Sequence, residues 1–368
     1  MNKVIHVVGA RPQFIKMAPL YNALRENLKQ VIIHTGQHYD FDMSDIFFDQ
    51  LNIPEPDYNL EVGSGKHGEQ TAKIITRLEE KLLKEQPSLV ILYGDTNSTL
   101  GAAIACSKLH FPMVHVEAGV RSFNRKMPEE INRIVTDKVA DIHFAPTKTA
   151  VNNLEKEGIN RFVYNTGDIM YDILKMNLTK IEHKKSLIRQ YNLSEGEYIL
   201  VTVHREVNTD RERLENVISA LSQIEEPVVF PLHPRTKKRL VQYNLLHKLI
   251  GKRNMQIISP VGYIEMLILE KFARLIITDS GGIQKEAYII GIPCITLREE
   301  TEWVETVDDG WNILVGNDET KILEGIKEFH PRGRRKNIFG DGNSAINMKK
   351  IILAYLNGET NYKLDINH

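Results

Sequence analysis

RLIITDSGGIQKEAYIIGIPCITL, residues 274–297, contains one complete strand–helix–strand pattern. The apolar, β-branched run 274–278 predicts a buried strand, which a polar Asp-Ser-Gly-Gly turn interrupts. Residues 283–290 then predict a helix. A Gly-Ile-Pro sequence ends this helix before a second buried strand over 294–297. Strand, helix and strand in this order are the repeating unit of a parallel α/β sheet.

The Ser-Gly-Gly turn lies where the predicted helix begins, and two interpretations of it are open. Free backbone N–H groups at Ser280, Gly281 and Gly282 can bind a phosphate, because the glycines have no Cβ to obstruct an anion. Glu286, one turn into the helix, can then accept hydrogen bonds from ribose hydroxyls. Alternatively this is an ordinary turn in which Asp279 or Ser280 caps the helix. The segment alone favours neither.

The composition is that of an ordinary globular protein. The 368 residues suffice for two domains with separate cores, and 42% apolar and 26% charged residues are typical values. The net charge of −1 gives no indication of nucleic-acid binding. We interpret the basic run over 330–336 as a solvated surface.

The sequence carries no targeting signal that we recognise. No apolar stretch approaches the ~20 residues of a membrane span. The start, MNKVIHVVGARP, lacks the apolar core of a signal peptide and predicts a first strand. Cys106 and Cys294 lie far apart in apolar segments, which predicts buried free thiols in a reducing compartment. We therefore expect a cytoplasmic enzyme without membrane contact.

Predicted strands and helices alternate along both halves of the chain. The predicted strands are 4–8, 31–34, 89–93, 113–116, 142–144, 162–164, 199–203, 228–232, 256–258, 275–278, 294–296 and 312–315. The predicted helices are one that begins at 13, 69–84, 97–108, 129–139, 147–157, 213–223, 237–247, 264–272, 283–290, 321–328 and 345–355, the last with Ser344 as N-cap. The pattern loosens over 167–178, which predicts a domain boundary there. We expect an α/β fold of two doubly wound, Rossmann-like domains facing each other across a cleft.

Charged and polar side chains recur where the predicted strands end, the edge at which such sheets bind ligands. They are Arg11, Lys16, His38, Asp95, Glu117 and Glu129 in the first half and His204, His233 and the Ser-Gly-Gly turn in the second. Each alone fits a structural role, such as a helix cap or an ion pair. Together they place acids in one domain and basic groups with a phosphate-type turn in the other. Basic groups and a helix N-terminus suit a diphosphate, and neighbouring carboxylates suit acid–base work on a neutral sugar.

Three motifs suggest other chemistries but lack the required context. Residues 63–68, GSGKHG, fit G-x-G-x-x-G, but a poor strand precedes them and no acid-ended strand follows ~20 residues on. His115-Val116-Glu117 fits H-x-E without the matching P-C-x-x-C, so we expect no zinc. Ser280 lacks the G-x-S-x-G elbow of a hydrolytic nucleophile. We therefore expect neither a dinucleotide nor a metal.

Eight motifs in order give the chain a resemblance to the non-hydrolysing UDP-N-acetylglucosamine 2-epimerases over essentially its whole length. They are GARPQFIK (9–16), HTGQHYD (34–40), YGDTNSTL (93–100), HVEAGVRS (115–122), MPEEINR (127–133), VTVHRE (201–206), LHPRTKK (232–238) and TDSGGIQKEA (278–287). The resemblance implies the glycosyltransferase-B architecture, with a first domain over 1–170 and a UDP-binding domain over 171–342. It also implies that a last helix, in 343–368, packs back on the first domain. A homodimer, no cofactor and a role in cell-surface polysaccharide synthesis are further implications.

The reaction implied by this resemblance inverts C2 of the sugar and interconverts UDP-GlcNAc and UDP-ManNAc. UDP is eliminated to leave a 2-acetamidoglucal and is added back after reprotonation from the other face. The matching motifs imply acid–base roles for Asp95, Glu117 and Glu129 and a UDP-phosphate or leaving-group role for His204. They imply substrate contacts at Arg11, Lys16, His38, Arg133, His233, Ser280, Gly281, Gly282 and Glu286.

Some positions depart from the usual motifs of the family. Gln13 replaces an acid, Val207 replaces a glutamate, and Trp303-Val304 replaces Arg-Pro. These changes resemble the branch that acts on UDP-2,3-diacetamido-2,3-dideoxyglucuronate, which is therefore an alternative substrate. A UDP-sugar-dependent glycosyltransferase and a non-catalytic nucleotide-sugar binder are alternatives of other classes. We expect residues 301–305 to set the sugar preference.

Overall fold

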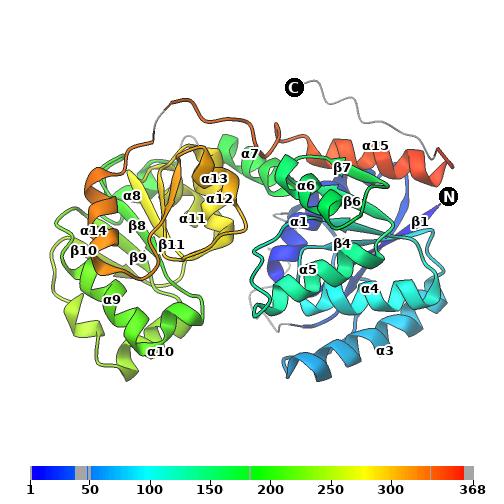
Figure 1. The fold of residues 1–368 in the computed structure, drawn as a ribbon, viewed down its shortest axis with the longest axis horizontal. Coiled ribbons are helices and arrows are strands. Elements are labelled where there is room, and N and C mark those ends of the chain that lie inside the picture. Colours follow the sequence, from blue (N-terminus) through cyan, green and yellow to red (C-terminus); the bar gives the residue numbers. More distant parts are fainter. Residues whose placement is uncertain (1, 38–47, 49–50, 182–183, 332, 360–368) are drawn as a thin grey trace. The chain divides into compact units, whose positions relative to one another are not determined.

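The computed structural model describes residues 2–37, 48, 51–181, 184–331 and 333–359. The predicted contact residue His38 lies outside the described residues. The chain divides into two compact units, Met1–Ile173 with Ile338–His368, and Leu174–Asn337. Each unit has its own parallel sheet (Figure 1). Over the described ranges, no helix is both long and apolar enough to cross a membrane.

The first unit is built on a parallel sheet. Its strands are β1 (Lys3–Val8), β2 (Lys29–His34), β3 (Tyr58–Asn59), β4 (Leu89–Tyr93), β5 (Met113–Val116), β6 (Ile142–Ala145) and β7 (Val163–Asn165). In the described residues the strand order is β3-β2-β1-β4-β5-β6-β7. Its helices are α1 (Arg11–Leu24), α3 (His67–Glu85), α4 (Asn97–Leu109), α5 (Pro128–Val139), α6 (Lys148–Lys156) and α15 (Ser344–Leu356). The central strands are continuous apolar runs because helices cover both faces, with α15 on one side and α3 and α4 on the other (Figure 1).

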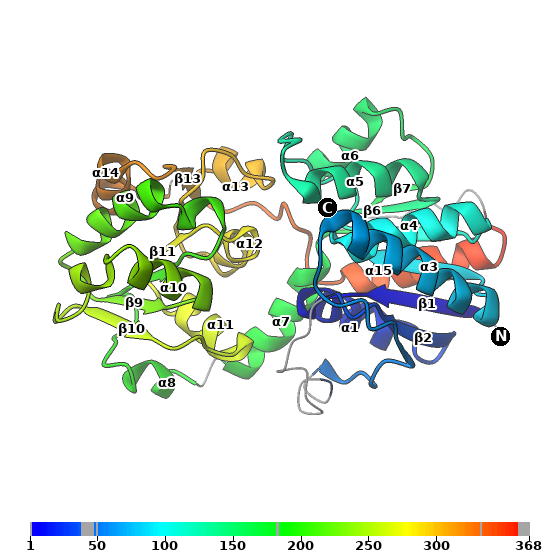
Figure 2. The same ribbon diagram turned by 90° about the horizontal axis from the view of Figure 1, so that it is seen from below.

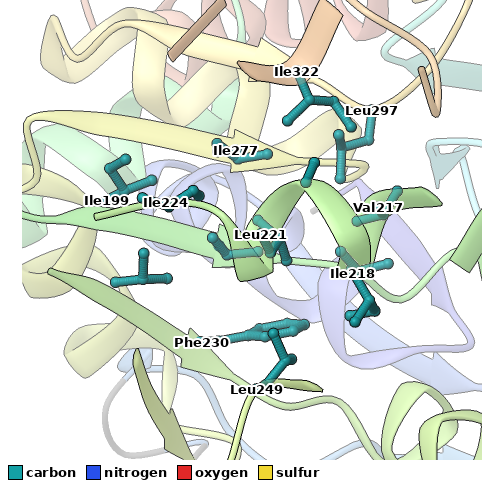
Figure 3. Packing of buried hydrophobic residues seen from close by; sticks show 14 of the residues in the cluster. Ile199, Val217, Ile218, Leu221, Ile224, Phe230, Leu249, Ile277, Leu297 and Ile322 are labelled. Atoms are coloured by element: carbon teal, nitrogen blue, oxygen red, sulfur yellow. The ribbon is translucent and has the colours of Figure 1, made fainter. Parts of the chain in front are cut away.

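The second unit repeats this architecture. Its strands are β8 (Ile199–Thr202), β9 (Val228–Pro231), β10 (Met255–Ile258), β11 (Leu275–Thr278), β12 (Cys294–Thr296) and β13 (Asn312–Leu314), in the order β10-β9-β8-β11-β12-β13. Its main helices are α9 (Arg211–Ser222), α10 (Pro234–Gln242), α11 (Tyr263–Lys271), α12 (Gly281–Ile290) and α14 (Glu319–Glu328). Figure 3 shows α9 side chains such as Leu221 packing with Phe230 of β9 and Ile277 of β11. Both sheets are parallel with interleaved helices, so the predicted α/β class is confirmed.

Two regions differ from the prediction. The first is the segment 167–178, where the sequence predicts a domain boundary but no helix; α7 (Ile169–Ile181) forms there and buries Ile169, Ile173 and Leu174. The two compact units divide within this helix. The second region is residues 301–305, where a short helix, α13 (Val304–Asp308), begins. The sequence does not predict these two helices, because neither has a strong helical pattern of apolar residues. Packing against neighbouring segments buries their apolar side chains instead.

The start of α15 shows a cap from a distant part of the chain. The predicted N-cap, Ser344, is wrong, because Ser344 is already helical and the N-cap residue is Asn343, whose side chain makes no capping bond. The side chain of Asp172 in α7 provides the cap instead. It accepts hydrogen bonds from the backbone N–H groups of Ser344 (2.9 Å) and Ala345 (2.8 Å). The helix then packs along α1 (Figures 1 and 2). The cap therefore ties α15 to α7.

Candidate active site

Asp95 follows β4, at the carboxyl edge of the first sheet. The preceding Gly94 has a φ of +62°, which turns the chain and presents the next side chain at that edge. Arg133 of α5 donates from Nη1 to Oδ2 of Asp95 at 2.8 Å. Burial raises the pKa of Asp95 although Arg133 and Lys16 oppose it, and its side chain remains 33% exposed. A carboxyl group with a raised pKa that still reaches solvent is suited to taking up and releasing a proton.

Glu117 follows β5 on the turn next to that of Asp95, since the backbone N–H of Gly94 donates to the carbonyl of Val116 at 3.0 Å. The charge of Glu117 helps to raise the pKa of Asp95. Its φ is +75°, an unfavourable value for a residue with a Cβ. Lys16 of α1 forms an ion pair with its carboxylate, and both side chains are largely buried. A Cβ at Gly94 would lie 3.3 Å from Lys16 Nζ and 3.5 Å from Glu117 Oε2, so the glycine leaves room for this pair. The strained backbone conformation therefore occurs at Glu117, a residue predicted to take part in acid–base chemistry.

The two carboxylates that open α5 have different environments. Glu129 is exposed on the first turn, and its charge also raises the pKa of Asp95. Glu130 is buried and accepts hydrogen bonds from the backbone N–H groups of Ser122 and Phe123, both at 2.9 Å. Burial opposes its ionisation, but Ser122 and Arg133 outweigh burial and lower the pKa of Glu130. Glu130 therefore anchors the loop before α5, and Glu129 is the member of the pair that solvent or a ligand can reach.

A buried amide supports this edge of the sheet. The Gln13 side chain accepts a hydrogen bond from the backbone N–H of Gly9 (2.7 Å) and donates to the carbonyl of Tyr93 (2.6 Å). It thus joins the ends of β1 and β4 immediately before the Asp95 turn. A carboxylate could accept from Gly9 but has no proton for the Tyr93 carbonyl. The sequence marks Gln13 only as a departure from a motif, without its reason.

In the second unit, Asp279 organises the turn that carries His204. Its buried carboxylate accepts hydrogen bonds from the backbone N–H groups of His204 (3.0 Å) and Arg205 (2.9 Å), and it lies 3.1 Å from His204 Nδ1. Burial opposes ionisation, but His204 outweighs it and lowers the pKa of Asp279. The His204 side chain remains 39% exposed. Asp279 therefore orients His204 rather than capping the next helix.

The phosphate-type turn is also a helix cap. Ser280 Oγ accepts from the backbone N–H of Ile283 at 3.4 Å and caps α12. A Cβ at Gly281 would lie 2.5 Å from Glu302 Oε1 and 3.3 Å from Trp303 Nε1. Segment 301–305 therefore packs directly on the glycine turn, and any larger residue at Gly281 would displace it.

Two arginines that the prediction omits accompany this turn. Arg298 Nη2 lies 2.8 Å and Arg205 Nη2 3.5 Å from the carboxylate of Glu302. Burial opposes its ionisation, but the arginines outweigh it and lower the pKa of Glu302 to about 2. Two arginines and one carboxylate therefore lie beside the N-terminus of α12, and their net positive charge suits an anion site. Only Arg205 lies within a recognised motif.

The remaining predicted residues lie in their expected units. His233 caps α10, with Nδ1 accepting from the backbone N–H of Arg235 at 3.2 Å, and its ring centroid is 5.7 Å from that of His204. Burial, His204 and Arg235 lower the pKa of His233. Glu286 is buried in the second turn of α12, and Arg11 is partly buried at the start of α1. Among the described residues, no three His, Cys, Asp or Glu side chains are grouped to hold a metal ion.

Two doubly wound parallel sheets, each with charged groups at the carboxyl ends of its strands, define a two-domain α/β protein of the glycosyltransferase-B type. The chain belongs to the UDP-N-acetylglucosamine 2-epimerase family, whose model matches residues 22–353. A UDP-N-acetylglucosamine 2-epimerase homolog of Methanococcus maripaludis is 54% identical over 95% of this chain and 99% of its own length. The UDP-2,3-diacetamido-2,3-dideoxy-D-glucuronate 2-epimerase of Pseudomonas aeruginosa is 46% identical over 88% of this chain and 91% of its own.

A solved structure agrees with these relatives. The crystal structure of Methanocaldococcus jannaschii UDP-GlcNAc 2-epimerase in complex with UDP-GlcNAc and UDP superposes with a TM-score of 0.88 at 44% identity. The match covers 95% of this chain and 99% of that one. The resemblance seen in the eight motifs is thus confirmed as family membership.

Proposed function

We propose that this chain is a non-hydrolysing UDP-sugar 2-epimerase that interconverts UDP-GlcNAc and UDP-ManNAc without a redox cofactor. The observation that carries the proposal is the group of Asp95 and Glu117 with Lys16 and Arg133 at the carboxyl edge of the first sheet. A non-catalytic nucleotide-sugar binder does not need two neighbouring carboxylates, whose charges repel each other. A transferase needs one base, whereas epimerisation moves a proton on both faces of one carbon.

The reaction proceeds by elimination and addition. The bond between C1 and the UDP oxygen breaks with its electron pair leaving on UDP, and a carboxylate takes the proton from C2, so that a 2-acetamidoglucal forms. A carboxylic acid then returns a proton to the opposite face of C2, and the UDP oxygen re-forms the bond to C1. We assign the proton transfers to Asp95, Glu117 and Glu129. The N-terminus of α12 and His204 stabilise the charge on departing UDP.

Replacing Asp95 with Asn tests this assignment. Asp95→Asn should lower turnover of UDP-GlcNAc by about 1,000-fold or more, because the amide cannot exchange the C2 proton, and UDP affinity should be retained. Turnover is followed by NMR without added NAD, and UDP binding by calorimetry. Glu79→Gln, an exposed change on α3, is the matched control. Retained turnover, or lost UDP affinity, would show that the role of Asp95 is misassigned.

A second candidate substrate is UDP-2,3-diacetamido-2,3-dideoxyglucuronate. Trp303 favours it, because Trp303-Val304 resembles that branch of the family and Trp303 lies beside the Gly281 turn, with Lys285 Nζ 4.1 Å from its ring. The Pseudomonas aeruginosa relative named for that sugar is 46% identical. Parallel assays with the two UDP-sugars decide between them by the ratio of kcat/KM.

We also propose a cytoplasmic homodimer that supplies sugars for polysaccharide synthesis. Cys106 and Cys294 are buried free thiols, which suits a reducing compartment. A monomer mass by light scattering would contradict the dimer.

A further inference from the structure

His115 lies in β5, two residues before Glu117, and the proposed reaction leaves it without a role. Its side chain is fully buried. Its Nδ1 is 2.6 Å from Asp137 Oδ1, and its Nε2 is 2.8 Å from the carbonyl oxygen of Gly94. The ring of His115 therefore links the side chain of Asp137 to the backbone immediately before Asp95.

Asp137 of α5 contacts His115 through one carboxylate oxygen and two further groups through the other. Its other oxygen, Oδ2, accepts from the backbone N–H of Gly119 at 3.0 Å and lies 2.7 Å from Arg121 Nη1. Burial opposes its ionisation, but His115 and Arg121 outweigh it and lower the pKa of Asp137 to about 2. Asp137 therefore remains an anion that contacts His115, Arg121 and the backbone of Gly119.

The contacts of this pair reach two turns of unusual backbone geometry. Gly94 has a φ of +62° and immediately precedes Asp95. Glu117 has a φ of +75° and Gly119 a φ of +78°, so the second turn contains two left-handed residues. Glycine adopts such values without strain, but the conformation of Glu117 persists only where surrounding bonds hold it. His115 bonds the first turn, and Asp137 bonds the second.

We propose that His115 and Asp137 are positioning residues that set the distance and orientation between the carboxyl groups of Asp95 and Glu117. The inference rests on the proposed epimerase function, in which both groups must face one sugar carbon. Neither residue touches the substrate; each acts through the backbone of a turn. A misplacement of about 1 Å at reacting groups can cost roughly 100-fold in rate, so small shifts of these turns suffice to disable the reaction.

His143 provides a matched control. It lies on the adjacent strand β6, is 2% exposed, and donates from Nε2 to the backbone carbonyl of Asp137 at 2.8 Å. It thus contacts the same residue from an equally buried place, but its bond to Asp137 does not involve Gly94 or Gly119. Variants at His115 and His143 change comparably buried side chains. Only the variants at His115 alter the hydrogen bond to the carbonyl of Gly94, which holds the Asp95 turn.

The test compares His115→Phe, His115→Gln and His143→Phe. We expect His115→Phe to lower kcat about 100-fold with KM and the Kd of UDP within about 3-fold. His115→Gln retains a donor for the Gly94 carbonyl and should recover about 10-fold of that loss. His143→Phe should lower Tm comparably while kcat stays within about 3-fold. If His115→Phe does not fold, a kcat of His115→Gln about 10-fold below wild type at unchanged KM supports the proposal.

Hydrogen exchange gives a second readout that does not depend on turnover. The backbone amides of residues 94–96 should exchange faster in His115→Phe and not in His143→Phe, because only His115 bonds the carbonyl of Gly94. Equal kcat values in the two variants, or equal exchange of residues 94–96 in both, would overturn the positioning role. A wild-type enzyme that epimerises neither UDP-sugar would overturn the proposed function instead, and the exchange comparison would still decide the inference.

Discussion

Gln13 shows how one side chain can connect a motif to the geometry of the site. Its amide joins the ends of β1 and β4, and Thr99 Oγ1 lies 3.1 Å from its Nε2. The sequence identifies the position because it departs from a motif. It does not identify the bonding partners, because they are backbone groups that only the folded sheet brings together.

Replacing Gln13 with Leu tests this connection. Leu has a similar volume but leaves the N–H of Gly9 and the carbonyl of Tyr93 buried without this partner. The free energy of unfolding should fall by about 2–4 kcal/mol. Urea titration measures it, with the exposed Gln242→Leu as control, since the Gln242 side chain lies at the surface and accepts from Arg239 Nη1. A loss below about 0.5 kcal/mol, within the range of neutral surface changes, would contradict the role given to the amide.

At the scale of elements, the strands were the most predictable part of the fold. The bounds predicted for β4, β5, β11 and β12 agree with the structure, because each is a short β-branched run between turn residues. The polar loop before α5 was less predictable. Its composition suggests a mobile segment, yet Arg121 and Ser122 are buried and bonded to Glu157 and Glu130. Such anchors come from residues distant in sequence, which a local pattern does not contain.

The capping of α15 by Asp172 leads to a prediction at this scale. Asp172→Ala should lower the free energy of unfolding by about 1–2 kcal/mol and should speed hydrogen exchange in α15, because two N–H groups lose their acceptor. Asp318→Ala is the control, since Asp318 caps α14 in the second unit by accepting from the N–H of Lys321. If the amides of α15 exchange at equal rates in both variants, the Asp172 cap does not stabilise α15.

For the whole molecule, the alternation of strands and helices was enough to predict two parallel sheets. It was also enough to predict that acids would gather in one unit, because parallel strands end at the same edge of a sheet. The charges of Glu117 and Glu129 help to raise the pKa of Asp95, as expected for carboxylates at one edge of a sheet. The buried partners of the site, among them His115, Asp137 and Asp279, were not predicted as such. Each looks locally like a core histidine or an ordinary helix residue, and its function depends on contacts across the sheet.

The central claim is that C2 is inverted by elimination and addition, with a proton exchanged at carbon. The direct measurement is NMR of UDP-GlcNAc incubated with the enzyme in D2O without NAD. We predict that UDP-ManNAc forms and that both epimers carry deuterium at C2, because the carboxyl groups exchange their protons with solvent. Epimerisation that retains hydrogen at C2 would indicate internal hydride transfer and would contradict the mechanism. The absence of epimerisation and exchange with both UDP-GlcNAc and UDP-2,3-diacetamido-2,3-dideoxyglucuronate would contradict the function.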